Sequence, residues 1–322
     1  MTQHHILAPF HLIGGGVWHA IDFAKALEKS GLGQTRLWSP RPAASALSAY
    51  PIDTIEPYSG ACPDGGHLWV IGPDVDIGHW YGSCKFEQVT LVYNQHAPDL
   101  FYRCMHALTA GLEHEVSIQY ASSALAREIG LPGEIHPPAF DIGRFFEEHA
   151  PMAKSPNRPF TVGRSSRDVT YKHHVDDPLL YRALLEAGCK IELVGASCIA
   201  SKLPASPHLN ISGEVHQRAI PAFLDRLDCF LYRTSPRKPE GFGLCIVEAM
   251  AAGLTVVAAR QGGYADIIRS GENGFLFESN EEAVKSVLAL KQNPDMRKQI
   301  GASAKQTIRR LFNNQKRSTS SG

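Results

Sequence analysis

Length, composition and charge exclude several classes of protein before any motif is considered. The chain has 322 residues, which suits two domains of roughly 150 residues each better than one core. Its formal net charge is zero, so charge gives no case for a nucleic-acid partner. No apolar run approaches the ~18 residues of a membrane-spanning helix. The seven cysteines form no C-x-x-C pair and favour a reducing cytoplasm, and the 15 histidines show no metal-binding spacing.

Along the first half of the chain, short apolar runs alternate with helical patterns. Strands are predicted at 6–13, 35–38, 67–72, 89–95 and 116–122, and helices at 17–29, 98–112 and 122–129. Strands that alternate with helices predict an α/β fold with a parallel sheet covered on both faces.

The alternation lapses at 146–157 and then resumes. FEEHAPMAKSPN at this point is polar and holds two prolines, which predicts a linker. Beyond it, strands are predicted at 159–164, 190–196, 208–215, 228–234, 254–259 and in a turn and strand at 271–277, and helices at 178–187, 219–227, 244–252, 266–270, 281–290 and 295–312. The sequence therefore predicts two Rossmann-like halves, 1–150 and 151–300, and a basic helix at 301–322. That helix either packs back on the first half or contacts anionic lipid.

The stretch PEGFGLCIVEAMAAGLTVVAARQGG, residues 239–263, places two glutamates around a helix start. One proline and two glycines disfavour a helix before Gly243 or Leu244. The unpaired N–H groups of that helix start form an anion site, and the small residues let a diphosphate approach the backbone. Glu248, one turn inside, could accept hydrogen bonds from ribose hydroxyls, and Glu240 faces the same mouth. Taken singly, the glutamates fit simpler interpretations better: one stabilises the helix dipole and the other is solvated.

The order of four features resembles the donor-binding signature of the retaining glycosyltransferases of family four, the glycosyl transferases group 1. These features are the two-glutamate spacing, EAMAAG, a double glycine before a helix and the turn GENGFL. VGRSSRDVTYKHH and HPPAFDIGRF are similar to the diphosphate-gripping segment and to the segment that leads into the interdomain linker. The resemblance implies the GT-B fold, in which two Rossmann-like domains face each other across a cleft. It also implies that the first domain binds the acceptor and the second binds the nucleotide-sugar donor.

The resemblance further implies a role for each matching residue of the second half. Arg164 and Lys172 neutralise the departing diphosphate. Glu240 contacts the transferred sugar, while Glu248 holds the ribose hydroxyls. The backbone is expected to lie close to the donor at Gly243, Leu244, Gly262 and Gly263. The spacing from Arg164 to Lys172 is longer than the family usually shows, so a solvated Lys172 is as good an interpretation, with Lys238 or Arg167 in its place.

In the first half, HLIGGGVWHAIDFAKAL places three glycines between a strand and a helix. The segment lacks the G-x-G-x-x-G pattern of dinucleotide sites, so a tight turn is the simpler interpretation. The resemblance implies that Gly15 and Gly16 close over the donor phosphates and that His96 lies near the donor sugar, where a structural histidine is equally expected. Weaker candidates are the possible acceptor contacts His19 and Asp22 and the aromatic pair Trp80 and Tyr81, for which packing is favoured.

These observations predict a retaining enzyme of the hexosyltransferase type that needs no metal and no cofactor. The donor is expected to be a UDP-sugar or, second, a GDP-sugar, and Glu240, Arg164, Lys172 and His96 form the expected catalytic set. The acceptor would be a glycan or a lipid-linked sugar in cell-surface polysaccharide or glycolipid synthesis, with contact at the inner membrane face. The alternatives are a GT-B sugar epimerase or phosphorylase, a non-catalytic nucleotide-sugar-binding protein, and a Rossmann oxidoreductase, against which the missing dinucleotide fingerprint counts.

Overall fold

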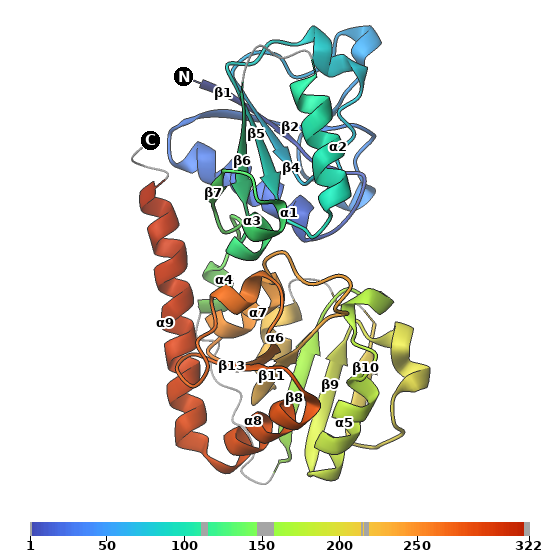
Figure 1. Ribbon diagram of the computed structural model, residues 1–322, viewed down its shortest axis with the longest axis vertical. Coiled ribbons are helices and arrows are strands. Elements are labelled where there is room, and N and C mark those ends of the chain that lie inside the picture. The colour runs from blue at the N-terminus through green and yellow to red at the C-terminus, as the bar shows by residue number, and fades with distance from the viewer. Residues whose placement is uncertain (1, 111–114, 147–157, 214, 216–218, 319–322) are drawn as a thin grey trace. The chain divides into compact units, whose positions relative to one another are not determined.

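The computed structural model describes residues 2–110, 115–146, 158–213, 215 and 219–318 (Figure 1). The chain divides into two compact units, one of Met1–Asp141 with Lys316–Gly322 and one of Ile142–Gln315. Each unit is built on a parallel sheet with helices, which confirms the predicted α/β class with two Rossmann-like halves. The predicted boundary at 150/151 and the linker beyond Phe146 lie outside the described residues.

The first unit has a seven-stranded sheet in the order β3-β2-β1-β4-β5-β6-β7. Its strands are β1 (Thr2–Leu7), β2 (Gly33–Ser39), β3 (Ile52–Thr54), β4 (His67–Ile71), β5 (Gln88–Tyr93), β6 (Val116–Tyr120) and β7 (Glu134–Ile135). Its main helices are α1 (Gly15–Lys29), α2 (Pro98–Thr109) and α3 (Ser123–Ile129). The order reverses direction between β1 and β4, which is the point where open α/β sheets bind their ligands.

The first strand starts earlier than the sequence pattern predicts. It runs over Thr2–Leu7, paired with β2 from Thr2 to Leu7, and not over 6–13. The polar pair His4 and His5 hid the strand, because both side chains are buried against indole rings. The Nε1 of Trp69 donates to His4 Nδ1 at 3.2 Å, and that of Trp38 donates to His5 Nδ1 at 2.9 Å.

The second unit has a six-stranded sheet in the order β10-β9-β8-β11-β12-β13. The strands are β8 (Phe160–Ser165), β9 (Cys189–Val194), β10 (Leu209–Ser212), β11 (Cys229–Tyr232), β12 (Thr255–Ala259) and β13 (Phe275–Phe277). The helices are α4 (Gly143–Phe146), α5 (Asp177–Glu186), α6 (Ile220–Leu224), α7 (Leu244–Ala251), α8 (Asn280–Gln292) and α9 (Pro294–Ser318). The helix predicted at 266–270 is wrong: a 3-10 turn covers Gly263–Asp266, and the Asn273 side chain binds the backbone of Ile267 and Arg269.

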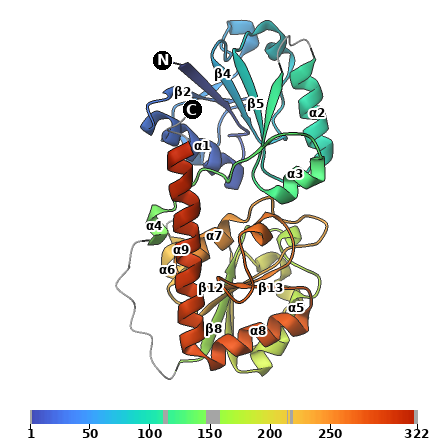
Figure 2. The same ribbon diagram turned by 60° about the vertical axis from the view of Figure 1, so that its left-hand side comes forward.

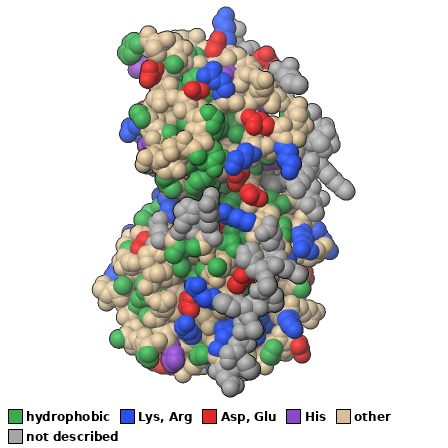
Figure 3. Space-filling view, turned by 180° about the vertical axis from the view of Figure 1, so that it is seen from behind, with side chains coloured by type: hydrophobic (Ala, Val, Ile, Leu, Met, Phe, Trp, Pro, Cys, Tyr) green, Lys and Arg blue, Asp and Glu red, His purple; other side chains and the backbone are tan. Residues whose placement is uncertain are grey.

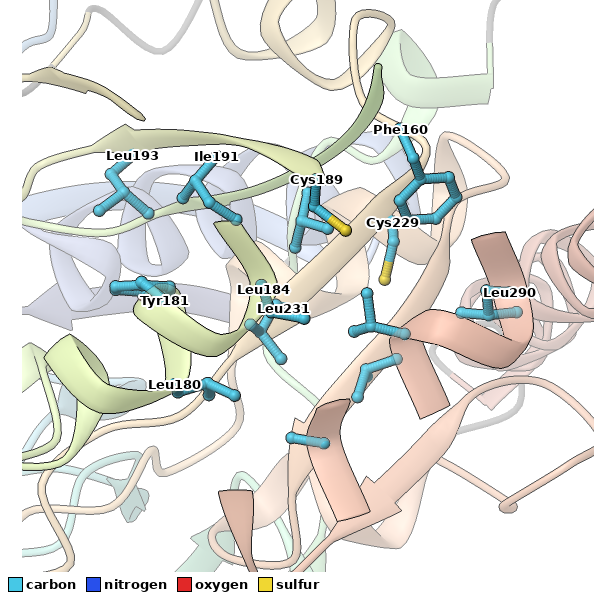
Figure 4. Close-up of a cluster of buried hydrophobic side chains, with 14 of the residues drawn as sticks. Phe160, Leu180, Tyr181, Leu184, Cys189, Ile191, Leu193, Cys229, Leu231 and Leu290 are labelled. Carbon is cyan, nitrogen blue, oxygen red and sulfur yellow. The ribbon is translucent and has the colours of Figure 1, made fainter. Parts of the chain in front are cut away.

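One face of this second sheet packs against α5 and α8 (Figure 4). Alternate strand residues point into the layer, as the period of two requires. The helices contribute residues at the helical period. The layer includes Phe160, Leu180, Tyr181, Leu184, Cys189, Ile191, Leu193, Cys229, Leu231 and Leu290. Burial of each large side chain contributes about 1.5–3 kcal/mol, so this layer holds the ends of β8 and β11 in place.

The last helix, α9, packs along the second unit (Figure 2). Thr255 Oγ1 donates to the carbonyl of Arg297 at 2.9 Å, and the guanidinium of Arg309 lies over the ring of Phe146 at 5.3 Å. Arg297 itself donates to the Leu290 carbonyl at 2.8 Å and stacks on Phe160. Part of the basic character of this segment therefore serves packing. That the helix packs back on the first unit stays a prediction.

Charged side chains of both signs are interspersed on the face shown in Figure 3. This distribution matches the zero net charge of the chain. Within the described part of the chain, no helix has both the length and the hydrophobicity to span a bilayer.

Candidate functional site

The predicted donor residues gather at one edge of the second sheet. The strand order changes direction between β8 and β11, and ligands of open α/β sheets bind outside the strand ends at such a point. Arg164 lies on β8 and Lys172 in the loop that follows it, within a 3-10 turn at Thr170–Lys172. Glu240 lies in the loop after β11, and the double glycine Gly262–Gly263 follows β12.

Lys172 and Glu240 form an ion pair although they lie 68 positions apart in the chain. The Lys172 ammonium donates to Glu240 Oε1 at 2.5 Å, and both side chains are mostly shielded. The hydroxyl of Tyr232, at the end of β11, donates to the same oxygen at 2.5 Å. Two donors on one oxygen fix the carboxylate of Glu240 at the edge of the sheet.

These contacts determine the protonation state of the Glu240 carboxyl. Burial raises the pKa of its carboxyl, but the charge and hydrogen bond of Lys172, the hydrogen bond of Tyr232 and the charge of Arg167 together lower the pKa below its usual value. Burial also raises the pKa of Tyr232, which therefore stays protonated and keeps donating. Glu240 is thus ionised at neutral pH.

The double glycine holds the backbone of the Glu240 loop. The Gly263 N–H donates to the Glu240 carbonyl at 2.9 Å. Gly262 has a φ of 69°, and a Cβ there would lie 2.5 Å from the same carbonyl oxygen. Only glycine allows both that φ and that approach. Gly262 and Gly263 therefore position Glu240, whereas their expected proximity to the donor stays a prediction.

Helix α7 begins at Leu244, as the sequence predicts. Gly243 precedes it in the left-handed region with a φ of 88°, and a Cβ there would lie 2.8 Å from the Tyr264 ring. The N-terminal end of α7 thus carries the positive end of the helix dipole only a few residues after Glu240. An anionic group is favoured at such a position.

Glu248 lies inside α7 in an environment opposite to that of Glu240. Its residue surface is only 7% exposed, and its nearest cation is Arg144 of α4, with Nη2 3.9 Å from Oε1. Burial raises the pKa of Glu248 to about 7, and the Arg144 charge opposes this shift only in part. A shielded carboxylate with so little compensation is suited to accept hydrogen bonds from a ligand.

Arg164 is enclosed by the protein, and its expected role in neutralising the diphosphate stays a prediction. It is 1% exposed, and its guanidinium is held within the protein. Nη1 donates to Asp177 Oδ2 at 3.3 Å and Nη2 to the Lys172 carbonyl at 2.5 Å. The predicted substitutes lie nearby: Lys238 Nζ is 4.7 Å from the Tyr171 ring centre, and Arg167 donates to the Tyr171 hydroxyl at 2.8 Å.

In the first unit, three predicted residues lie at the carboxyl-terminal edge of the sheet. Gly15 and Gly16 are the first residues of α1, and a Cβ on Gly16 would be 3.5 Å from the Asn94 side chain, just after β5. His96 lies two residues beyond Asn94 and its Nδ1 is 3.1 Å from Glu128 of α3. Its Nε2 is buried without a hydrogen-bond partner among the described residues, so that nitrogen is available to a ligand.

The weaker candidates of the first unit are mostly internal. Burial lowers the pKa of His19 to about 4, so this ring is neutral. Asp22 accepts a hydrogen bond from the Asp141 N–H at 3.1 Å. Trp80 and Tyr81 are 6% and 3% exposed, which agrees with packing.

Sequence reasoning missed the residues that hold the predicted ones in place. Tyr232 holds Glu240, Asp177 and Arg233 hold Arg164, and Glu128 holds His96. A tyrosine at a strand end was visible in DCFLYRT, but nothing in the pattern pairs it with a residue of the next loop. In the described residues, no group of three or more His, Cys, Asp or Glu side chains could hold a metal ion.

Part of the second unit, which includes Lys172 and Glu240, is similar in sequence to a known protein family. Residues 167–307 match the family model described as Glycosyl transferases group 1. Trehalose synthase of Pyrococcus horikoshii is 42% identical over 98 residues, which are 30% of this chain and 23% of that protein. Alpha-monoglucosyldiacylglycerol synthase of Acholeplasma laidlawii is 32% identical over 92 residues, which are 29% of this chain and 22% of that protein. The matches thus span about a quarter of the length of these curated relatives.

Solved structures resemble the whole chain in fold. HepE of Anabaena in complex with UDP has a TM-score of 0.74 at 17% identity, over 99% of this chain and 97% of that chain. WaaG, a glycosyltransferase involved in lipopolysaccharide biosynthesis, has a TM-score of 0.69 at 13% identity, over 99% of this chain and 100% of that one. At these identities the likeness shows the GT-B fold.

Proposed function

We propose that this chain, whose residues 167–307 match the Glycosyl transferases group 1 family and whose fold is GT-B, transfers a sugar from a nucleoside diphosphate sugar with retention of anomeric configuration. One observation carries the proposal: the Lys172–Glu240 ion pair lies beside the start of α7, at the switch point of the second sheet. A cation, a helix dipole and an ionised carboxylate at one sheet edge suit a substrate that combines a diphosphate with a polyhydroxyl group.

The second unit is the donor site in this proposal. The α7 N-terminus and Lys172 stabilise the negative charge that grows on the departing diphosphate, which is the main demand of the reaction. Glu248 accepts hydrogen bonds from the two ribose hydroxyls, which add donors to a carboxyl that burial strips of water. Glu240 contacts the transferred sugar, where its negative charge also favours the positive charge that develops at the anomeric carbon.

The donor is a UDP-sugar in this proposal, with a GDP-sugar second. Support comes from the structural relative HepE, which was solved with UDP and with UDP-glucose. The reaction needs no divalent metal, because Lys172 and the helix dipole supply positive charge at the diphosphate. Equal transfer rates in EDTA and in Mg²⁺ support that statement, and loss of transfer in EDTA contradicts it.

A thermal-shift panel tests the donor site. UDP, GDP, ADP, UDP-glucose and NADH are added to the wild type and to Glu248→Ala, since a ligand of the folded state stabilises it by RT ln(1 + [L]/Kd). The proposal expects one diphosphate to raise the melting temperature of the wild type but not of the variant. A shift by NADH alone overturns the proposal in favour of an oxidoreductase, and no shift at all overturns the donor site.

The acceptor is a glycan or a lipid-linked sugar in this proposal. Support comes from relatives, which include an alpha-monoglucosyldiacylglycerol synthase and a glycosyltransferase involved in lipopolysaccharide biosynthesis. Product analysis with UDP-glucose separates the rivals. Sugar 1-phosphate formed from added phosphate identifies a phosphorylase, and an isomeric UDP-sugar identifies an epimerase.

The protein acts in the cytoplasm at the inner membrane face in this proposal. The exposed cations Lys298, Arg309 and Arg310 of α9 could contact anionic headgroups. Sedimentation with phosphatidylglycerol vesicles tests this contact. Binding that falls with salt and with Lys298→Ala/Arg310→Ala supports it, and equal recovery with neutral vesicles contradicts it.

A further inference from the structure

Two thiols of the first unit lie against each other, away from the proposed donor site. The Sγ atoms of Cys62 and Cys84 are 3.5 Å apart, although the residues lie 22 positions apart in the chain. Cys84 is buried and Cys62 is partly exposed. The sulfur atoms of a disulfide bond lie about 2 Å apart, so these two atoms must approach by about 1.5 Å. A change in the side-chain torsion of Cys62 supplies a movement of this size.

Hydrogen bonds hold together the two chain segments that carry these thiols. The Gly65 N–H donates to the Lys85 carbonyl at 2.6 Å, and the Glu87 N–H donates to the Gly66 carbonyl at 2.7 Å. The Lys85 N–H also donates to Asp64 Oδ1 at 2.7 Å. All three bonds lie directly beside the two cysteines. The backbone therefore already keeps the thiols within reach of each other, and only side chains need to move.

The thiol pair lies at the amino-terminal edge of the first sheet. Cys62 is in the segment that leads into β4, and Cys84 is in the segment that leads into β5. Gly16 and His96, which are expected near the donor, lie instead at the carboxyl-terminal edge, beyond β1 and β5. The role of the thiol pair is therefore independent of the proposed function.

We propose that Cys62 and Cys84 form a site of reversible oxidation, at which hydrogen peroxide converts the two thiols into a disulfide bond. Cys62 reacts first, because it is the more exposed of the two and burial raises the pKa of the Cys84 thiol to about 12. Its sulfur attacks one peroxide oxygen, the O–O bond breaks, and a sulfenic acid and one water form. The Cys84 sulfur then attacks the Cys62 sulfur, the S–O bond breaks, and the hydroxyl leaves as a second water with the Cys84 proton. The sulfurs lose two electrons, which the peroxide gains.

The neighbouring thiol protects Cys62 from irreversible damage. A sulfenic acid that meets no thiol is open to further oxidation to a sulfinic acid, which thiol reductants do not reverse. Cys84 lies 3.5 Å from the oxidised sulfur and intercepts it first. Thiol reductants then reopen the disulfide by thiol–disulfide exchange. In a reducing cytoplasm such a bond is transient and forms during oxidative stress.

Peptide mapping tests the site directly, because the tryptic peptide 37–85 contains Cys62, Cys84 and no other cysteine. The folded protein is treated with equimolar hydrogen peroxide, alkylated, digested and analysed by mass spectrometry. We expect this peptide to become lighter by two hydrogen atoms and resistant to alkylation. After a further cut before Asp74, which lies between the two cysteines, we expect the halves to stay joined until dithiothreitol is added.

Two variants and the unfolded chain serve as controls. Cys62→Ser is expected to leave Cys84 open to alkylation after peroxide treatment and unfolding, whereas Cys198→Ser, which removes an exposed thiol elsewhere, is expected to leave the bond unchanged. The ratio of disulfide to dithiol is also measured in a glutathione buffer, for the folded protein and for the chain in urea. We expect folding to raise this ratio at least about 100-fold, because the fold and a well-placed disulfide stabilise each other equally. Equal ratios in the two states, a sulfinic acid at Cys62, or a bond from either cysteine to a third one overturns the inference.

Discussion

The loop before α7 and the second turn of α7 hold the same residue type in opposite states. Glu240 receives hydrogen bonds from Lys172 and Tyr232, and its pKa falls below the usual value. Glu248 has one cation at 3.9 Å, and burial raises its pKa to about 7. Both carboxyl groups are shielded from water, so compensation by partners, not burial alone, separates them.

Under the proposed function, this difference suits the two glutamates to different tasks. Glu240 is already ionised and oriented, so it can interact with the sugar without gaining or losing a proton. Glu248 is partly protonated near neutral pH, and two ribose hydroxyl donors would stabilise its ionised form. Donor binding would therefore lower the pKa of Glu248 and release a proton.

Removal of the cation at Glu240 is expected to have the largest effect. Lys172→Met removes the positive charge that the proposed function places at the diphosphate, and it leaves Glu240 without its ion-pair partner. We expect the rate of sugar transfer or donor hydrolysis with UDP-glucose to fall by about 100- to 1000-fold. Lys190→Met, which breaks an ion pair with Glu192 on β9, is the matched control. A Lys172→Met rate within threefold of the control would remove Lys172 from the site.

The next largest effect is expected from the glycine that touches the Glu240 backbone. Gly262→Ala and Gly271→Ala carry similar backbone strain, with φ of 69° and 84°, and each costs about 1 kcal/mol of folding free energy. A Cβ meets the Glu240 carbonyl at Gly262 but nothing within 4 Å at Gly271. We expect kcat to fall by about 10- to 100-fold in Gly262→Ala only. Equal kcat values in the two variants would show that the position of the Glu240 loop does not limit the reaction.

A smaller effect is expected from Glu248. Glu248→Gln keeps the shape but removes the charge from two hydrogen bonds, so we expect the Kd for UDP to rise about tenfold at pH 8, where wild-type Glu248 is ionised. The exposed Glu272 of the same unit gives the control Glu272→Gln. Calorimetry measures both constants. An unchanged Kd in Glu248→Gln would contradict the ribose assignment.

The smallest effect is expected on folding stability and comes from buried, neutral histidines of the first unit. Burial lowers the pKa of His4 and His5 and takes that of His67 to about 4. The unfolded chain takes up protons below about pH 6.5 and the folded chain does not, so stability is full above that pH and falls as pH decreases towards about 4. Urea unfolding at pH 7.5 and pH 5 measures the loss. We expect this loss of unfolding free energy to be smaller in His67→Gln but unchanged in His79→Gln, an exposed control. Equal losses in the two variants would show that buried His67 does not cause the pH dependence.

The sequence predicts the features that local backbone chemistry determines. It misses the features that contacts between distant side chains determine. Proline and glycine place the α7 start at Leu244, and motif order predicts that Lys172 and Glu240 serve one site, where the structure joins them. The buried orientation of Arg164 depends on Asp177 and Arg233, which are remote in the chain and carry no motif. The sequence pattern places the first strand too late in the chain, because His4 and His5 are polar residues that indole partners bury.

The pH dependence of UDP-glucose binding tests the central claim most directly, because the diphosphate of this donor does not titrate near neutral pH. Calorimetry from pH 6 to pH 8.5 on the wild type and on Glu248→Gln gives the two profiles. The pKa of Glu248 without ligand is about 7, and the proposed ribose contact requires its ionised form, so the account predicts that wild-type affinity rises with pH and levels off above about pH 7.5. It also predicts a flat profile for the variant. A flat wild-type profile, or the same slope in both proteins, would contradict the placement of the donor ribose at Glu248.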